Sequence, residues 1–147
     1  MYIKGRAVVK SYYEKIKDSL KNLSERVKIH IGWIPHSKLP LFYRAANIFV
    51  RTSKYENFGL GTVESMACRT PVIATNAVTF PEIVGDKVTL YKPEDSLDLA
   101  DKVIALLTDH NLYKSVLEYQ SLRVHELFDI NIIAQKYIEL YASLIHQ

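Results

Sequence analysis

The chain has 147 residues, of which 48% are hydrophobic and 24% are charged, and its formal net charge is +3. This length predicts one globular domain with a sizeable core and leaves no room for two full domains. The charges of both signs are interspersed, which argues against nucleic acid as a partner, because such binders gather basic residues on one face.

The single cysteine, Cys68, excludes an internal disulfide and a cysteine metal cluster, and it suits a reducing compartment. No apolar run approaches the roughly 20 residues that a membrane span needs, and no signal peptide precedes the first strand-like segment. We therefore expect a cytoplasmic protein without a transmembrane segment, with peripheral contact to a membrane left open.

Strand-like and helical patterns alternate from the first residues onward. Tyr2–Lys4 is a short strand-like opening, and apolar residues then recur at three- and four-residue steps from Val9 to Leu23, which predicts an amphipathic helix. Polar and apolar residues alternate over 26–31, which predicts a second strand. Ser37 is the expected cap of a short helix through Ala46.

The same alternation continues to the C-terminus. The third, fourth and fifth strands are expected at 47–51, 71–74 and 88–91, and residues 59–68 between the third and fourth have helical spacing. Ser96 is the expected cap of the next helix. Two further helical patterns span 112–124 and 133–144. The sequence therefore predicts an α/β fold with a doubly wound, mostly parallel five-stranded Rossmann-like sheet, helices on both faces and a helical C-terminus.

The loop after the third strand is the most unusual segment of the chain. In doubly wound sheets, ligands bind where strands end and loops lead into helix N-termini. Gly59 and Gly61 let the backbone approach a ligand at such a point, and the start of a helix offers free N–H groups and partial positive charge. These features favour a phosphate group.

Two carboxylates flank the same helix start. Glu56 lies in the loop and Glu64 about one turn inside the helix, so both can border one cleft. A carboxylate repels a diphosphate but accepts two hydrogen bonds from a pair of hydroxyl groups, and a nucleotide sugar carries such pairs on its ribose and on its sugar. On the residues alone, a solvated Glu64 and a helix-capping Glu56 are the alternative interpretation.

The segment 56–75 closely resembles the E-x7-E segment of the large retaining glycosyltransferase family 4, or glycosyl transferases group 1, whose members have the GT-B fold. Segments 27–34, 41–50 and 80–84 match the same family in the same order. The resemblance implies that residues 1–147 are a single nucleotide-sugar-binding domain, the C-terminal, donor-binding half of a GT-B fold. It also implies that no metal or other cofactor is needed.

The resemblance assigns roles to individual residues. Glu56 would be the catalytic residue that contacts the donor sugar, and Glu64 would hold the ribose hydroxyls. For Trp33, a half-buried surface aromatic is an equal alternative to a place beside the base. The donor-binding residues besides Glu64 would be Asn57, Phe58, Gly59 and Leu60 through backbone N–H groups, Trp33 and Ile34 beside the base, and also Gly61, Gly5 and Lys54.

The sequence departs from the family pattern in several places. The family's N-terminal acceptor domain, first strand-helix unit and diphosphate-clamping cations have no counterpart here, and Lys54, Arg51 or Arg6 would replace those cations or be solvated. We expect the five strands to close into the order 2-1-3-4-5, the alternative being a strand from another chain. Arg69 and the segment 77–80 stand where glycines are usual, which predicts backbone strain of roughly 1 kcal/mol at Arg69 and altered donor binding.

The expected function is retaining transfer of a sugar from a nucleotide-diphosphate sugar, performed with a partner chain or domain or as a homo-oligomer. The isolated chain would be nearly inactive. A non-catalytic nucleotide-sugar sensor or assembly subunit is the alternative. A receiver-type signalling module ranks lower, because the first strand ends in Lys4-Gly-Arg6 rather than in acidic residues.

Overall fold

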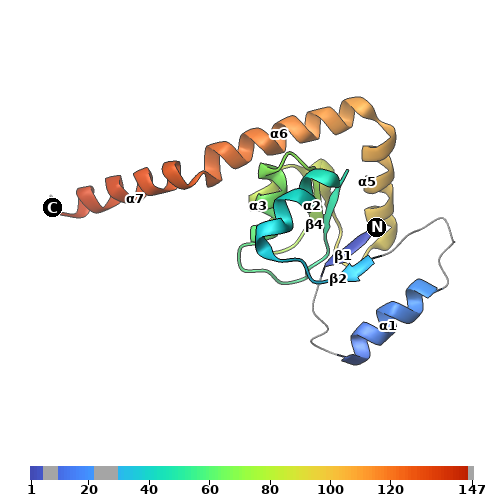
Figure 1. The fold of residues 1–147 in the computed structure, drawn as a ribbon. Helices are drawn as coiled ribbons and strands as arrows, with labels where there is room; N and C mark the ends of the chain where they lie inside the picture. The colour runs from blue at the N-terminus through green and yellow to red at the C-terminus, as the bar shows by residue number, and fades with distance from the viewer. Residues whose placement is uncertain (5–9, 22–29, 146–147) are drawn as a thin grey trace. The chain divides into compact units, whose positions relative to one another are not determined.

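The computed structural model describes residues 1–4, 10–21 and 30–145. They fall into two compact units, Met1–Leu39 and Pro40–Gln147. In the first unit, the parallel strands β1 and β2 pair with Ile3 opposite Ile31. Its elements are β1 (Tyr2–Lys4), α1 (Lys10–Lys21), β2 (His30–Gly32) and the 3-10 helix η1 (His36–Lys38) (Figure 1).

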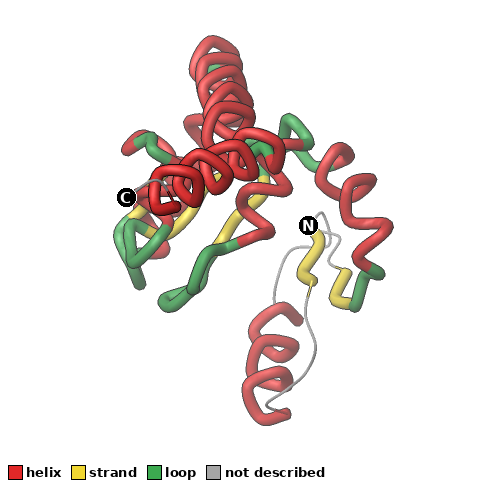
Figure 2. The backbone as a smooth tube through the Cα atoms, turned by 90° about the vertical axis from the view of Figure 1, so that its left-hand side faces the viewer, coloured by secondary structure: helices red, strands yellow, loops and turns green. Residues whose placement is uncertain are grey.

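The rest of the chain is built around a second parallel sheet, in which β4 is the central strand between β3 and β5. Figure 2 shows the strands in yellow and the helices in red. The elements are α2 (Leu39–Ala45), β3 (Phe49–Arg51), α3 (Leu60–Ala67), β4 (Val72–Thr75), α4 (Phe80–Val84), the 3-10 helix η2 (Lys87–Thr89), β5 (Leu90–Tyr91), α5 (Ser96–Thr108), α6 (His110–Phe128) and α7 (Ile130–Ile145).

The predicted α/β class, parallel strands and helical C-terminus are confirmed. The described strands form two hydrogen-bonded sets, a pair and a triplet, so the order 2-1-3-4-5 stays a prediction. The predicted second strand begins within residues 26–29, which lie outside the described residues. The fifth strand is shorter than expected because Lys87–Thr89 forms a 3-10 turn. The short helix α4 was not predicted.

Two predicted helix caps are wrong. Asp95, not Ser96, caps α5, because its Oδ1 accepts hydrogen bonds from the N–H groups of Leu97 and Asp98, at 3.2 and 3.0 Å. Ser96 is the first helical residue. A carboxylate caps well and also complements the positive end of the helix dipole. Ser37 lies inside η1 rather than at the N-cap of α2.

Side chains of β4 alternate between two apolar cores, one on each face of the sheet. Val72 and Ala74 face α3 and α4, whereas Ile73 faces α5, so helices cover both faces as predicted. The first core consists of Met66, Val72, Ala74, Phe80, Ile83, Val84, Leu90 and Val124. The second consists of Ile73, Tyr91, Leu106 and Val116, with Ile48, Leu99, Val103 and Leu112 packed against it.

Helix α6 joins the two cores across the amino end of β4. Val116 and Val124 lie on one stripe of the helix and belong to different cores. Gln120, between them, is 1% exposed. Its side chain accepts a hydrogen bond from Val72 N at 2.8 Å and donates to Val72 O at 3.0 Å and to Thr89 Oγ1 at 3.2 Å. One buried amide therefore satisfies both backbone groups of the residue that begins β4.

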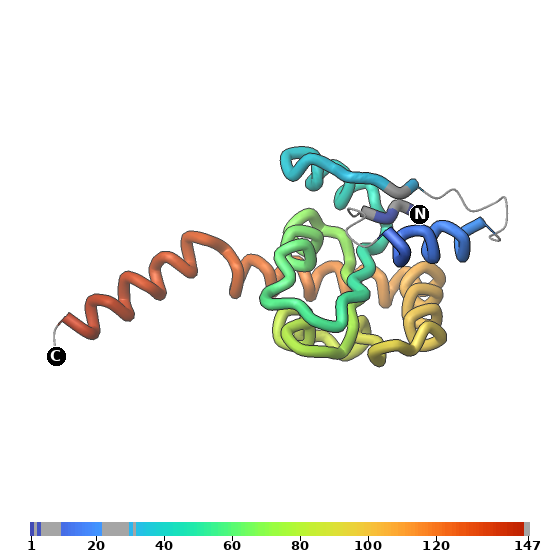
Figure 3. The backbone as a smooth tube through the Cα atoms, turned by 90° about the horizontal axis from the view of Figure 1, so that it is seen from below, coloured from blue at the N-terminus to red at the C-terminus, as the bar shows by residue number. Residues whose placement is uncertain are grey.

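Helix α7 follows α6 and extends away from the sheet (Figures 1 and 3). None of its residues is buried. Many of its apolar side chains are exposed, among them Tyr137, Leu140, Tyr141 and Leu144. Within the described ranges, no helix has both the length and the apolar character needed to cross a bilayer.

Candidate functional site

Three loops follow the carboxyl ends of β3, β4 and β5, and the loop after β3 is tied to the other two. Thr75 Oγ1 donates a hydrogen bond to Ser53 O at 2.8 Å, and Thr79 Oγ1 donates to Glu56 O at 3.5 Å. Lys54 forms an ion pair with Glu94 in the loop after β5. These contacts fix the backbone that leads into α3.

Helix α3 begins directly after Gly59, whose backbone is left-handed with φ 79°. A Cβ atom at this position would lie 3.1 Å from the ring of Phe80 and 3.4 Å from Cγ of Glu56. Any side chain at this position would therefore adopt a strained backbone and would crowd the Phe80 ring. Thr62 N already donates to Gly59 O at 2.8 Å, so in the first turn of α3 the N–H groups of Leu60 and Gly61 remain as donors for a ligand.

The residues on either side of Gly59 are exposed, whereas Gly59 itself is buried. Asn57 is exposed, and Phe58 and Leu60 are 44% and 66% exposed. The ring of Phe58 packs in a T-shaped arrangement against the ring of Phe128 on α6, with 5.7 Å between the ring centroids. Gly61 serves a different purpose from Gly59, because a Cβ atom there would lie 3.3 Å from Oη of Tyr43. The absence of a side chain at Gly61 leaves room for the phenol group of Tyr43. The backbone of Gly61 lies in the first turn of α3.

Glu64 is held by Tyr43, which lies on α2. Tyr43 Oη donates a hydrogen bond to Oε2 of Glu64 at 3.1 Å. Burial raises the pKa of Tyr43 above its ordinary range, and the charge of Glu64 raises it further. The phenol therefore stays neutral and keeps its proton as a donor. The sequence analysis missed this contact, because nothing in the pattern links two residues 21 positions apart.

Glu56 is held by Arg51, the last residue of β3. Arg51 Nη2 donates to Oε2 of Glu56, and the two side chains are 33% and 23% exposed. The positive charge of Arg51 also acts on Tyr43, where it opposes the effect of Glu64 on the pKa. These side chains are thus one electrostatic group beside the start of α3. The group, hereafter the acidic cluster, consists of Tyr43, Arg51, Glu56 and Glu64.

The other predicted donor-binding residues are placed as follows. Lys54 forms an ion pair with Glu94, and both side chains are exposed. Trp33 is 58% exposed and Ile34 is buried; both belong to the first unit. Gly5 and Arg6 lie outside the described residues. The structure therefore brings together Glu56, Glu64 and the segment between them, and leaves the base-side residues unplaced relative to them.

Two residues within the segments where the resemblance predicts glycines have left-handed backbones. Arg69, after α3, has φ 60°, which confirms the conformation predicted there. Val78, in the loop after β4, has φ 49° and is exposed. A β-branched residue rarely adopts this conformation, which costs roughly 1 to 3 kcal/mol. Because Thr79 contacts Glu56, this strain lies next to the acidic cluster.

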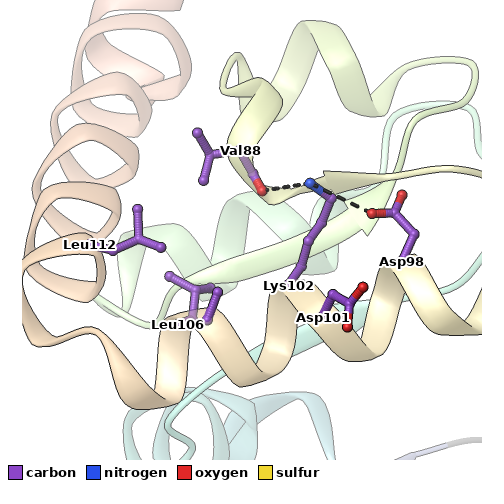
Figure 4. Close-up of a pocket in the computed structure, with 7 residues that line it drawn as sticks. Val88, Asp98, Asp101, Lys102, Leu106 and Leu112 are labelled. Atoms are coloured by element: carbon purple, nitrogen blue, oxygen red, sulfur yellow. Dashed lines mark hydrogen bonds and ion pairs between the residues drawn. The ribbon is translucent and has the colours of Figure 1, made fainter.

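A separate hollow of about 410 Å³ lies between α5, α6 and the 3-10 helix η2 (Figure 4). Lys102, the cation in its lining, donates to Val88 O at 3.0 Å and lies 3.9 Å from the Asp98 carboxylate. The hollow contains none of the predicted donor-binding residues. Nowhere in the described part of the chain do three or more His, Cys, Asp or Glu residues group as metal ligands.

Known proteins resemble this chain in sequence. The model of the family described as glycosyl transferases group 1 matches residues 3–122. O-antigen chain mannosyltransferase B from Escherichia coli is 38% identical over 80 residues, which are 54% of this chain and 21% of that protein. Mannosylfructose-phosphate synthase from Agrobacterium fabrum is 30% identical over 129 residues, which are 86% of this chain and 28% of that protein. The chain spans less than a third of the length of these curated relatives.

Solved structures match over almost the whole chain. Sucrose-phosphate synthase from Thermosynechococcus elongatus has a TM-score of 0.82 and 31% identity, covering 99% of this chain and 38% of that chain. HepE from Anabaena, solved with UDP-glucose, has a TM-score of 0.85 and 23% identity, covering 97% of this chain and 40% of that one. The fold is thus that of part of a GT-B glycosyltransferase, and the chain belongs to the glycosyl transferases group 1 family.

Proposed function

We propose that this chain is the donor-binding part of a retaining glycosyltransferase of family 4, and that it binds a nucleotide-diphosphate sugar at the start of α3. One observation carries the proposal. Two carboxylates, each held by a neighbouring donor, flank a glycine-bounded helix start at the carboxyl end of a parallel sheet.

The proposed ligand fits the chemistry of these groups. A diphosphate suits the N–H groups from Asn57 to Gly61, because the helix start carries partial positive charge. Glu64 accepts the ribose hydroxyls and Glu56 accepts those of the transferred sugar. Trp33 and Ile34 lie beside the base in this proposal, and Lys54 and Gly5 near the diphosphate. The protein contributes positioning and stabilisation of the leaving diphosphate, without a side-chain nucleophile or a metal.

The relatives support a sugar nucleotide as the donor. Their names include a mannosyltransferase and two sugar-phosphate synthases, and one structural neighbour was solved with UDP-glucose. Since the matched relatives are several times longer, we propose that transfer requires a partner domain or subunit, or a second copy of the chain, to supply the acceptor site. The proposed location is the cytoplasm, including the surface of a membrane.

One observation favours the alternative of a nucleotide-sugar sensor without turnover. Arg51 and Lys54, the described candidates for the diphosphate clamp, are both engaged by carboxylates. A sensor would bind the nucleotide sugar as tightly with its partner as alone, and it would transfer no sugar in either state. Accumulation of glycosylated product once the partner is added separates the enzyme from the sensor.

Calorimetric titration with UDP, GDP and ADP and with their sugars tests the proposed donor site. We expect one base to be preferred, and Glu64→Ala to weaken that binding about ten- to hundredfold, because a charged hydrogen bond contributes roughly 1.5 to 3 kcal/mol. Glu118→Ala, an exposed glutamate on α6, is the matched control and should bind like the wild type. Equal affinity of Glu64→Ala and wild type would remove the ribose assignment.

A further inference from the structure

Arg51 lies beside the glutamate that the proposed function assigns to the donor sugar. It ends β3, and because strand side chains alternate, it points to the same face of the sheet as Phe49. Phe49 packs against the core that α3 covers. The ion pair of Arg51 with Glu56 is therefore partly withdrawn from water, and salt weakens such a pair less than an exposed one.

The pair leaves part of each partner unused. Arg51 donates through Nη2 to Oε2 of Glu56, and within the described residues no hydrogen bond to Oε1 is recorded. The Nε atom of Arg51 is buried and has no hydrogen-bond partner in the described part of the chain. Glu56 is thus fixed through one oxygen, while the other can accept hydrogen bonds from a bound molecule.

We propose that Arg51 is a positioning residue for the donor sugar, which holds Oε2 of Glu56 so that Oε1 meets the hydroxyl groups of the transferred sugar. This inference rests on the proposed function and adds the residue that sets how much the sugar contributes to donor binding. A carboxylate already held in place loses less rotamer freedom when the sugar binds, so its hydrogen bonds contribute more to affinity.

Arg51 variants should change the contribution of the sugar to donor affinity. A general structural role of Arg51 would instead change the affinity for all nucleotides together. A nucleoside diphosphate lacks the transferred sugar, so loss of Arg51 should lower its affinity by a smaller factor than the affinity of the nucleotide sugar. The informative quantity is the sugar ratio, defined as the Kd of the nucleoside diphosphate divided by the Kd of the corresponding nucleotide sugar. A loss of fold or of diphosphate binding would change both constants together.

Calorimetry of the 147-residue chain with UDP and UDP-glucose, GDP and GDP-mannose, and ADP and ADP-glucose measures this ratio. We expect Arg51→Met to lower it about tenfold, the effect of one charged hydrogen bond, with a smaller loss of diphosphate affinity. Arg51→Lys should restore part of the ratio, because lysine keeps the charge but not the planar fork. Arg44→Met, an exposed arginine on α2, is the control and should leave the ratio unchanged.

A double variant tests whether Arg51 acts through Glu56. Glu56→Gln should lower the sugar ratio by itself, and adding Arg51→Met should lower it no further, because the two residues form one unit. An unchanged ratio in either single variant, or a parallel loss of diphosphate and sugar affinity, would overturn the positioning role alone. Failure of the wild-type chain to bind any of the six nucleotides would overturn the proposed function together with it.

Discussion

Polar groups at the two ends of β4 are hydrogen-bonded in different ways. At the amino end, Gln120 satisfies both backbone groups of Val72 inside a closed core. At the carboxyl end, polar groups of the loop after β3 are held by the side chains of Thr75, Thr79 and Arg51, which lie at the strand ends and in the loop after β4. The first arrangement is buried and complete, whereas the second is partly exposed and leaves donors and acceptors for a ligand.

We infer that folding stability depends on the amino end of β4 and ligand binding on its carboxyl end. Groups buried at the amino end cannot be left unpaired without a large loss of folding free energy. Groups at the carboxyl end are paired in a way that a ligand can share or replace, and one residue there, Val78, adopts a strained backbone. Substitutions at the two ends should therefore change different measurements.

The largest expected effect on stability is at the amino end. Gln120→Ala leaves the N–H and C=O groups of Val72 buried without partners, which should lower the free energy of unfolding by roughly 2 to 4 kcal/mol. Urea denaturation measures the change. Gln135→Ala, an exposed glutamine on α7, is the control and should have little effect. An equally small change in the free energy of unfolding of both variants would mean that Gln120 does not satisfy the backbone groups of Val72.

At the carboxyl end, Val78→Gly should stabilise the fold. Glycine adopts φ 49° without strain, so we expect a gain of about 1 kcal/mol, seen as a higher Tm. Arg69→Gly relieves a left-handed backbone away from the loops and should stabilise less, because arginine is not β-branched. Only Val78→Gly should also change donor affinity, and an effect of Arg69→Gly on binding would contradict this division.

The smallest expected effect concerns the exposed pair of Lys54 and Glu94. Lys54 lowers the pKa of Glu94, so any stabilisation is present at neutral pH and is lost as acid protonates the carboxylate. Both groups are solvated, and such pairs contribute little. Lys54→Ala should therefore leave the Tm at pH 7 unchanged. A clear drop in Tm would show that the loops after β3 and β5 depend on this contact.

The sequence predicted the elements that a local pattern encodes. The apolar run of β4 and the glycines at the start of α3 predicted a buried strand and a loop suited to a ligand, and both glutamates were recognised beside it. The capping of α5 was misread because Asp95 and Ser96 are adjacent and both can cap a helix. Short-range patterns leave such choices to the local backbone geometry.

Contacts between distant segments could not be predicted from the sequence. Tyr43 meets Glu64 only because α2 packs beside α3, and no spacing rule connects them. Gln120 offered a signal that was not used, since a polar residue between Val116 and Val124 on an apolar stripe indicates a buried hydrogen-bonding role. Val78 has a left-handed backbone, and the next residue, Thr79, contacts Glu56 in the loop after β3.

NMR titration of the isotope-labelled chain with UDP, GDP and ADP tests most directly whether the start of α3 binds the donor. The backbone amides from Phe58 to Gly61 should shift on addition of the preferred nucleotide, while the amide of Val72, bonded to Gln120, should not. Shifts gathered around Lys102 and Leu112 instead, or no shifts with any of the three nucleotides, would contradict a donor site at this helix start.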